Sequence, residues 1–295
     1  MKDQFIAVDG VRIRYRESAG SGVPVLLTHG IGGSLEMWHE QLSRLGGSLR
    51  LIAWDLPGHG LSDLGKQPYD PDTFSAFAWR FVDALKLDRL VLVGNSLGGA
   101  ISLRMADSQP DRVAGLLLAN AAGLGKETPL PFRLMTLPLL GEMLSKPGPI
   151  AVEQQLKAIF HDQSVVSEHV RAFVTRNVHR EGGSQAFVAT LRRMTRLSGQ
   201  KSDLVEQSLA IIRRLQLPIF FLHGLQDGVL PFKHSAEASK LASHRGLFLI
   251  ENCGHTPQIE VPDQFNRILL DLVGSNVADD AVGAASSDMG GALTH

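Results

Sequence analysis

One pentapeptide, Gly-Asn-Ser-Leu-Gly at positions 94–98, places a serine between two glycines at the end of an apolar run. The residues before it, Leu90–Val93, have the pattern of a buried strand, and Leu97–Ser108 has the pattern of a helix. A serine on so sharp a turn takes up a strained backbone conformation, and a side chain at either glycine would crowd it. The serine is presented over a helix N-terminus, whose free N–H groups can stabilise a developing negative charge. The pattern therefore predicts Ser96 as a nucleophile.

Apolar runs with strand character alternate with helical patterns up to residue 123 and again from residue 216. This alternation is typical of an α/β fold, a mostly parallel sheet with helices on both faces. The first two strands flank Asp9-Gly10, which favours an antiparallel hairpin. We expect strands at 5–8, 11–18, 23–28, 49–54, 90–93, 113–119, 218–222 and 246–250. We expect helices at 37–45, from a cap at Asp72 or Thr73 to about residue 85, at 97–108 and at 262–273.

The pattern changes between residues 124 and 215, where helical periodicity continues without a convincing strand. We interpret this stretch as a helical cap inserted into a core formed by residues 1–123 and 216–274. Its first part is apolar and broken by prolines, and could line a pocket. The pocket candidates there are Phe132, Met135, Leu139 and Met143. Residues 275–295 are rich in Gly, Ala, Ser and Asp, and we expect a flexible tail.

The composition excludes several classes of protein. The chain has 295 residues, of which 44% are hydrophobic and 20% charged, and a net charge of −1. A large core is therefore expected, and the overall charge gives no reason to expect binding to nucleic acid or to an anionic membrane. The single cysteine, Cys253, allows no internal disulfide and fits a reducing compartment. With no signal-peptide pattern and no apolar span, we expect a cytoplasmic protein.

A serine nucleophile needs a base and a carboxylate that orients the base, and both should lie on loops at the carboxyl ends of strands. His255 follows the last predicted core strand, and Asp227 follows the strand before it. Their order along the chain, Ser96, Asp227 and then His255, is the order expected after such a serine turn. Asp55 also follows a strand and is the main competitor to Asp227.

The other histidines and two further residues have simpler interpretations. His29, His59 and His223 adjoin glycines in loops and are expected to brace them, whereas His161, His169 and His179 should lie on the surface. Cys253 is expected to be a small packed residue. Glu260 is expected to cap or brace the last helix.

Taken together, these motifs resemble the α/β-hydrolase superfamily, and in particular its small, capped serine hydrolases. The resemblance extends to about residue 274 and rests on four motifs in order: residues 29–33, residues 55–63, residues 94–99, and the Asp227 and His255 loops. It implies an oxyanion hole formed by the backbone N–H groups of Ile31 and Leu97. It also implies close approach of the substrate to Gly32.

The expected reaction is hydrolysis of carboxylic esters of small apolar molecules through an acyl-enzyme on Ser96, with no metal or organic cofactor. Related dehalogenases and epoxide hydrolases have an aspartate where this chain has Ser96. Besides the cap candidates, we expect Gly32, Asn95 and Val229 to contact substrate. The sequence does not determine the oligomeric state.

Several other functions stay open. Gly94-Asn95-Ser96 also resembles hydrolases that cleave carbon–carbon bonds in vinylogous diketones, the meta-cleavage products of aromatic degradation. Those enzymes carry an asparagine where this chain has Glu40 and a tryptophan where it has Thr256. Enol-lactone hydrolases and cofactor-free perhydrolases resemble this chain about as well as simple esterases do. The last alternative is a hydrolase-fold protein that senses a ligand without catalysis.

Overall fold

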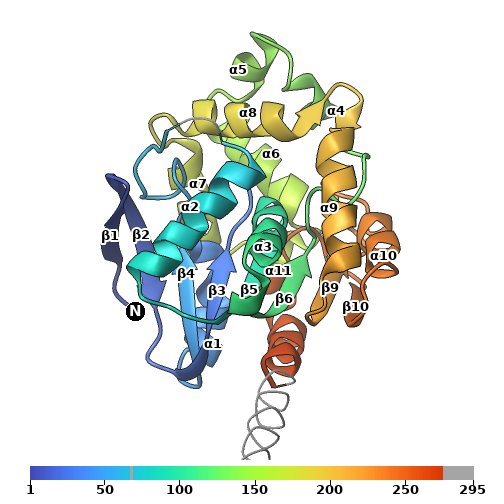
Figure 1. Ribbon diagram of the computed structural model, residues 1–295. Helices are drawn as coiled ribbons and strands as arrows, with labels where there is room; N and C mark the ends of the chain where they lie inside the picture. The colour runs from blue at the N-terminus through green and yellow to red at the C-terminus, as the bar shows by residue number, and fades with distance from the viewer. Residues whose placement is uncertain (67–68, 275–295) are drawn as a thin grey trace, which may run out of the picture.

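A sheet of eight strands forms the centre of the molecule (Figure 1). The structure is a computed structural model, which describes residues 1–66 and 69–274. The expected flexible tail, residues 275–295, lies outside the described residues. The strand order is β1-β2-β4-β3-β5-β6-β9-β10. Strand β2 pairs antiparallel with both β1 and β4, and every other pair of neighbouring strands is parallel. The strands are β1 Gln4–Val8, β2 Val11–Glu17, β3 Ser21–Thr28, β4 Leu49–Trp54, β5 Leu90–Asn95, β6 Val113–Ala119, β9 Ile219–Gly224 and β10 Arg245–Ile250.

The central strands are apolar on both faces because helices cover both faces. Successive residues of β5 alternate between two clusters: Leu92 packs with one and Val91 and Val93 with the other. The first cluster includes side chains of α2 (Pro71–Ala84), α3 (Leu97–Ser108) and α9 (Ser202–Arg214). The second includes side chains of η1 (Leu35–Trp38), α1 (His39–Leu45) and the helix 262–274. This is the predicted α/β-hydrolase architecture, with a parallel sheet between two helical layers.

The start of α2 differs from the prediction by two or three residues. Asp70, rather than Asp72 or Thr73, is the N-cap, and its carboxylate accepts a hydrogen bond from Thr73 N at 2.9 Å. Pro71 occupies the first position of the helix, where its missing N–H costs nothing. The proline therefore moves the helix start to the residue before the predicted cap.

Between β6 and β9 the chain forms mainly helices, which lie above the sheet in Figure 1. They are α4 Leu130–Leu134, α5 Leu140–Leu144, α6 Pro149–Ile159, η3 Gln163–Val165, α7 Glu168–Val178 and α8 Gly183–Met194. The expectation of no strand here is wrong in one place. Two short strands, β7 (Thr195–Arg196) and β8 (Gly199–Gln200), form an antiparallel pair. A strand of two residues is too short to leave an alternating pattern in the sequence.

Helix α9 was expected within the cap but packs against α3 of the core. Arg104 on α3 donates to Gln207 Oε1 at 3.0 Å and to Ser208 Oγ at 3.3 Å. The remaining elements are the turn η2 (Pro110–Arg112), α10 (Lys233–Ser239) beside β9 and β10, and α11 (Pro257–Glu260). Among the residues described, no helix has the length and apolar character needed to cross a bilayer.

Candidate active site

The turn at Ser96 joins β5 to α3 and is strained as predicted. Ser96 has φ of 56° and ψ of −116°, and its N–H donates to the carbonyl oxygen of Ala119 at 3.0 Å. A Cβ atom on Gly94 would lie 2.2 Å from the carbonyl oxygen of Gly98, and one on Gly98 would lie 2.1 Å from that of Thr28. Only glycine fits at either position, so this local geometry follows directly from the pentapeptide.

The loop after β3 lies against the serine turn. A Cβ atom on Gly30 would lie 3.0 Å from the Cβ of Ser96. Within residues 1–66 and 69–274, the backbone N–H groups of Ile31 and Leu97 donate to no acceptor. Two free donors on loops that meet at a serine can stabilise an oxyanion. The assignment of Ile31 and Leu97 as oxyanion donors stays a prediction that this arrangement supports.

Asp227 lies on the loop after β9 and points into the protein. One carboxylate oxygen, Oδ1, accepts from the backbone N–H groups of Val229 at 2.7 Å and Leu230 at 3.0 Å. The other, Oδ2, lies 2.8 Å from Nδ1 of His255. The Asp227 side chain is fully buried. The two residues chosen from chain order are therefore hydrogen-bonded to each other.

Two residues that the sequence analysis did not assign to this site also contact the Asp227 carboxylate. Asn120, the residue after β6, donates from Nδ2 to Oδ2 at 2.7 Å, and His223 places Nε2 3.1 Å from the same oxygen. The second ring nitrogen of His223 lies 2.8 Å from Ser235 Oγ. Burial alone would raise the pKa of Asp227, but the imidazoles of His255 and His223 hold it well below its ordinary value. The carboxylate therefore stays ionised.

His255 is held by its main chain as well as by its ring. Its N–H donates to the carbonyl oxygen of Ile159 at 3.0 Å, and its carbonyl oxygen accepts from Asn95 Nδ2 at 3.0 Å. Asn95 thus ties the histidine loop to the residue next to Ser96. In the described residues no hydrogen bond joins the His255 ring to Ser96 Oγ. Such contacts are often long in unliganded enzymes and shorten when substrate binds.

Asn95 was expected to contact substrate, but its environment indicates another role. The side chain is buried, and Nδ2 donates to the carbonyl oxygens of His255 and Ala119. It therefore joins two loops of the core.

Glu260 was expected to cap or brace the last helix, and that expectation is wrong. Its Oε2 accepts from the backbone N–H groups of His161 at 2.8 Å and Asp162 at 3.0 Å, and its Oε1 accepts from Gly254 N at 2.9 Å. Glu260 therefore joins the loop after α6 to the loop that carries His255.

Asp55, the competing carboxylate, serves a different part of the core. Its oxygens accept from the backbone N–H groups of Leu35 at 2.6 Å and Leu61 at 2.8 Å, and Oδ2 lies 3.3 Å from Arg14 Nη1. Burial raises the pKa of Asp55 to about 6. No hydrogen bond in the described residues links it to His255. Its role is to hold the loops after β3 and β4 together.

A partly buried ion pair lies beside this network and joins the cap to the core. Arg176 on α7 donates to both oxygens of Glu36, at 2.9 and 2.8 Å, and to Ser34 Oγ at 3.2 Å. Arg14 donates to Glu36 from the core side at 2.7 Å. Burial alone would raise the pKa of Glu36, but the hydrogen bonds from Arg176 and Arg14 hold it far below its ordinary value. The two guanidinium groups therefore share one carboxylate.

Two cap side chains that the sequence analysis did not select lie over the loop after β3. A Cβ atom on Gly32 would meet Phe187 of α8 at 3.3 Å and Gln155 of α6 at 3.7 Å. Gly32 has φ of 69°, which favours glycine independently of this contact. The cap therefore reaches the core at Gly32 through α6 and α8.

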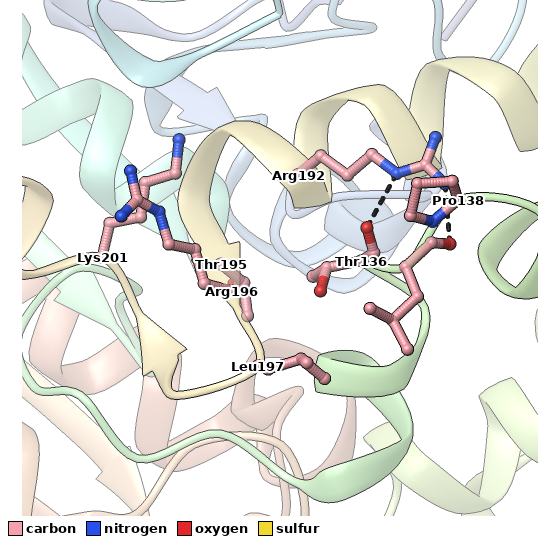
Figure 2. A pocket seen from close by; sticks show the side chains of 8 residues that line it. Thr136, Pro138, Arg192, Thr195, Arg196, Leu197 and Lys201 are labelled. Carbon is pink, nitrogen blue, oxygen red and sulfur yellow. Dashed lines mark hydrogen bonds between the residues drawn. The ribbon is translucent and has the colours of Figure 1, made fainter.

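The predicted pocket residues lie in different environments. Phe132 and Met135 are half-buried, but Leu139 and Met143 are 85% and 56% exposed, which argues against a place in a closed pocket wall. Val229 lies beside Asp227 and lines a cavity of about 290 Å³ with Glu127 and Pro129. A larger, open hollow of about 560 Å³ lies on the cap, between the α4–α5 connection and the β7–β8 turn (Figure 2).

The remaining histidines and the cysteine lie as expected. His29 is buried and accepts from Leu56 N at 3.1 Å, bracing its loop. His59 is also buried, whereas the cap histidines His161, His169 and His179 are exposed. Burial raises the pKa of Cys253 far above its ordinary value, so its thiol stays protonated.

Residues 23–262 match the family model described as the alpha/beta hydrolase fold. The chain belongs to the α/β-hydrolase family. This hydrolase is 30% identical over 262 residues to a 2-hydroxy-6-oxo-2,4-heptadienoate hydrolase of Pseudomonas putida, covering 86% of this chain and 90% of that one. It is 28% identical over 277 residues to an uncharacterized protein of Mycobacterium bovis, covering 90% and 79%. A crystal structure of a serine hydrolase involved in carbazole degradation superimposes with a TM-score of 0.75 at 25% identity, covering 92% of this chain and 98% of that one.

Proposed function

We propose that this α/β hydrolase is a serine esterase that acts on carboxylic esters of small apolar molecules. The observation that carries the proposal is the buried His255–Asp227 pair, whose Nδ1 and Oδ2 atoms lie 2.8 Å apart. Asn95 ties the loop of His255 to the strained serine turn. A buried imidazole–carboxylate pair next to a strained serine is the arrangement that activates a hydroxyl group for attack on a carbonyl carbon.

The ring of His255 is oriented for base catalysis. The ionised Asp227 can only accept a hydrogen bond, so Nδ1 of His255 carries the proton and Nε2 is left free as the base. In the proposed reaction Nε2 takes the proton from Ser96 Oγ, which attacks the ester carbonyl. The N–H groups of Ile31 and Leu97 stabilise the oxyanion, and the imidazolium then protonates the leaving alcohol. Water, deprotonated by the same ring, releases the acid and restores Ser96.

The alternative is carbon–carbon bond cleavage, and the name of the Pseudomonas putida relative favours it. The dienoate substrate in that name carries a carboxylate at the opposite end of its carbon chain from the 6-oxo group, and a free cation in the site would favour its binding. Arg176 is the cation that the cap directs at the loop after β3, and Glu36 already neutralises it with two hydrogen bonds. This favours an uncharged ester over an anionic diketone. Enol-lactones resemble esters at the reacting carbon and stay within the proposed chemistry.

We also propose that the cap, predicted as residues 124–215, selects the substrate while the core loops perform the chemistry. Phe187 and Gln155, close to Gly32, support this division. Because α9 packs on α3, we assign residues 202–214 to the core in this proposal.

A panel of p-nitrophenyl esters of increasing acyl length, assayed beside a dienone meta-cleavage product, tests the function. We expect hydrolysis of the esters and labelling of the protein by a fluorophosphonate. If the dienone is cleaved with a higher kcat/KM than every ester, the carbon–carbon alternative is correct. If the protein neither turns over substrate nor reacts with the phosphonate, it is a ligand-binding member of the family.

A further inference from the structure

Large apolar side chains are exposed on the outer surface of the cap. They belong to α4, α5, the connection between them and the β7–β8 turn, at the top of the molecule in Figure 1. Each large side chain of this group is between 42% and 85% exposed. We call this group the cap crown; its residues are Leu130, Pro138, Leu139, Met143, Leu144 and Leu197.

Hydrogen bonds connect the segments that carry the crown. Arg133 on α4 donates to the carbonyl oxygen of Leu197 in the β7–β8 turn. Arg192 on α8 donates to the carbonyl oxygens of Thr136 at 3.1 Å and Leu137 at 2.9 Å, both in the α4–α5 connection. Figure 2 shows the hollow that these segments enclose, with apolar side chains from both sides in its lining. The crown is therefore one surface.

Leu139 combines two unfavourable features. It is 85% exposed, and its φ of 65° is a conformation that leucine rarely adopts. At this exposure the side chain gains little from packing against the described residues. A strained residue of this kind is a starting point for a hypothesis of function. Here the strained turn keeps a large apolar side chain pointing away from the protein.

The crown is also strongly basic. Its segments, residues 130–150 and 192–201, contain six lysines and arginines and one carboxylate, Glu142, although the net charge of the chain is only −1. Glu142 is bound by Arg192. Arg196 and Lys201 form no ion pair with the described residues, and in Figure 2 both side chains extend to the side of the hollow away from Arg192. Two uncompensated cations thus border an exposed apolar surface.

We propose that the cap crown docks on an anionic lipid surface. The exposed leucines enter the boundary between headgroups and acyl chains, and Arg196 and Lys201 contact the phosphates of the headgroups. A second copy of this chain is a poor occupant, because two basic crowns would repel each other. An acidic protein is also disfavoured, because none of the six crown residues is aromatic, whereas protein interfaces favour aromatic anchors. The proposal does not depend on the esterase activity.

Flotation of the full chain with lipid vesicles tests the proposal. We expect the protein to float with vesicles of phosphatidylglycerol and phosphatidylcholine in equal parts, and to remain behind with vesicles of phosphatidylcholine alone. High salt should release it, because salt screens the contact with the headgroups. Failure to bind the mixed vesicles at low salt would overturn the proposal.

Two sets of variants separate the apolar from the electrostatic contribution. Arg196→Gln with Lys201→Gln should weaken vesicle binding roughly 30-fold, at about fivefold per charge near an anionic surface. The charge-matched control, Lys86→Gln with Lys233→Gln, changes exposed lysines away from the crown and should bind as the parent does. Equal weakening by both pairs would attribute binding to net charge and overturn the crown assignment.

The apolar set is Leu130→Ser, Leu144→Ser and Leu197→Ser in one chain, compared with Leu247→Ser and Leu270→Ser, two exposed leucines outside the cap. The crown variant should bind vesicles at least tenfold more weakly than the parent. Its thermal midpoint and its hydrolysis of p-nitrophenyl acetate should equal those of the parent. If polyglutamate beads retain the parent and the crown variant equally well, the crown is a surface that binds any polyanion. A crown variant that changes oligomeric state, with no vesicle binding by the parent, would identify a contact between copies. Either result would overturn lipid docking.

Discussion

The loops around Ser96 and the cap crown differ in their exposure to solvent. Around Ser96 almost every polar group is buried and bonded, and Asp227 alone accepts hydrogen bonds from two backbone N–H groups, Asn120 and two imidazoles. On the crown, helices of five residues expose leucines, and the β7–β8 segment beside them carries the uncompensated cations Arg196 and Lys201. The first region holds a fixed geometry, which catalysis needs. The second leaves apolar area and charge available to something outside the molecule.

The largest expected effect lies in the first region. Ser96→Ala should lower kcat by about 10⁶-fold, because removing the nucleophile removes the acyl-enzyme pathway. Peptide mapping after fluorophosphonate treatment should find the adduct on Ser96 in the parent and no adduct in the variant. An adduct on another serine would contradict the assignment of the nucleophile.

The two competing carboxylates should separate activity from stability. Asp227→Asn should lower kcat on the order of 10⁴-fold, because the amide favours the wrong tautomer of His255. Asp55→Asn should keep most of kcat and lower the thermal midpoint, since Asp55 joins core loops. Steady-state kinetics and thermal unfolding of both variants decide between them, and the reverse pattern would show that Asp55 is the carboxylate that orients His255.

A smaller effect should come from the cap surface that faces the core. Phe187→Ala should change the ratio of kcat/KM between short and long acyl esters roughly 10–200-fold, because Phe187 lies at Gly32. Leu139→Ala, on the outer surface, is the matched control and should leave the ratio as it is. Phe132→Ala and Met135→Ala test the half-buried candidates. If only Leu139→Ala changes the ratio, the substrate pocket lies on the other side of the cap.

The smallest effect is on the pH dependence of stability. Burial lowers the pKa of His59 to about 4, below the ordinary value of 6.5, so unfolding takes up a proton between these values. The stability gained by keeping His59 neutral is present above pH 6.5 and is lost as the pH falls towards 4. His59→Gln should reduce the slope of the free energy of unfolding against pH by up to about 1.4 kcal/mol per unit. Chemical denaturation at several pH values measures it, and an unchanged slope would mean that His59 is not neutral in the folded protein.

The sequence was most informative where backbone geometry restricts residue type. The two glycines around Ser96 predicted the turn, and the alternation of apolar runs predicted the sheet. The positions of Asp227 and His255 after the last two core strands, and their order after Ser96, predicted their pairing. Asn120 and His223 were not selected, because an amide after a strand and a histidine before a glycine are common in ordinary loops. Their role appears only when three strand ends are brought together.

The cap was harder to predict for two reasons. Its apolar residues look alike in sequence whether they face the core, as Phe187 does, or water, as Leu139 does, and helices of five residues provide little periodicity to distinguish the two. Net charge was also uninformative about the cap, because a value of −1 for the whole chain does not reveal the basic segments of the crown.

The hydrogen bonds from the end of α6 have a consequence for engineering. The carbonyl oxygen of Ile159 accepts from both the N–H of His255 and the hydroxyl of Thr256, at 3.0 Å each. A chimera that exchanges the whole insertion for that of a relative would support the histidine loop only if its backbone places a carbonyl oxygen at the same point. Grafts that begin after Asp162 keep both contacts, together with those of Glu260 to His161 and Asp162. The insertion up to Asp162 is therefore inherited with the histidine loop, and only the remainder can be transplanted independently.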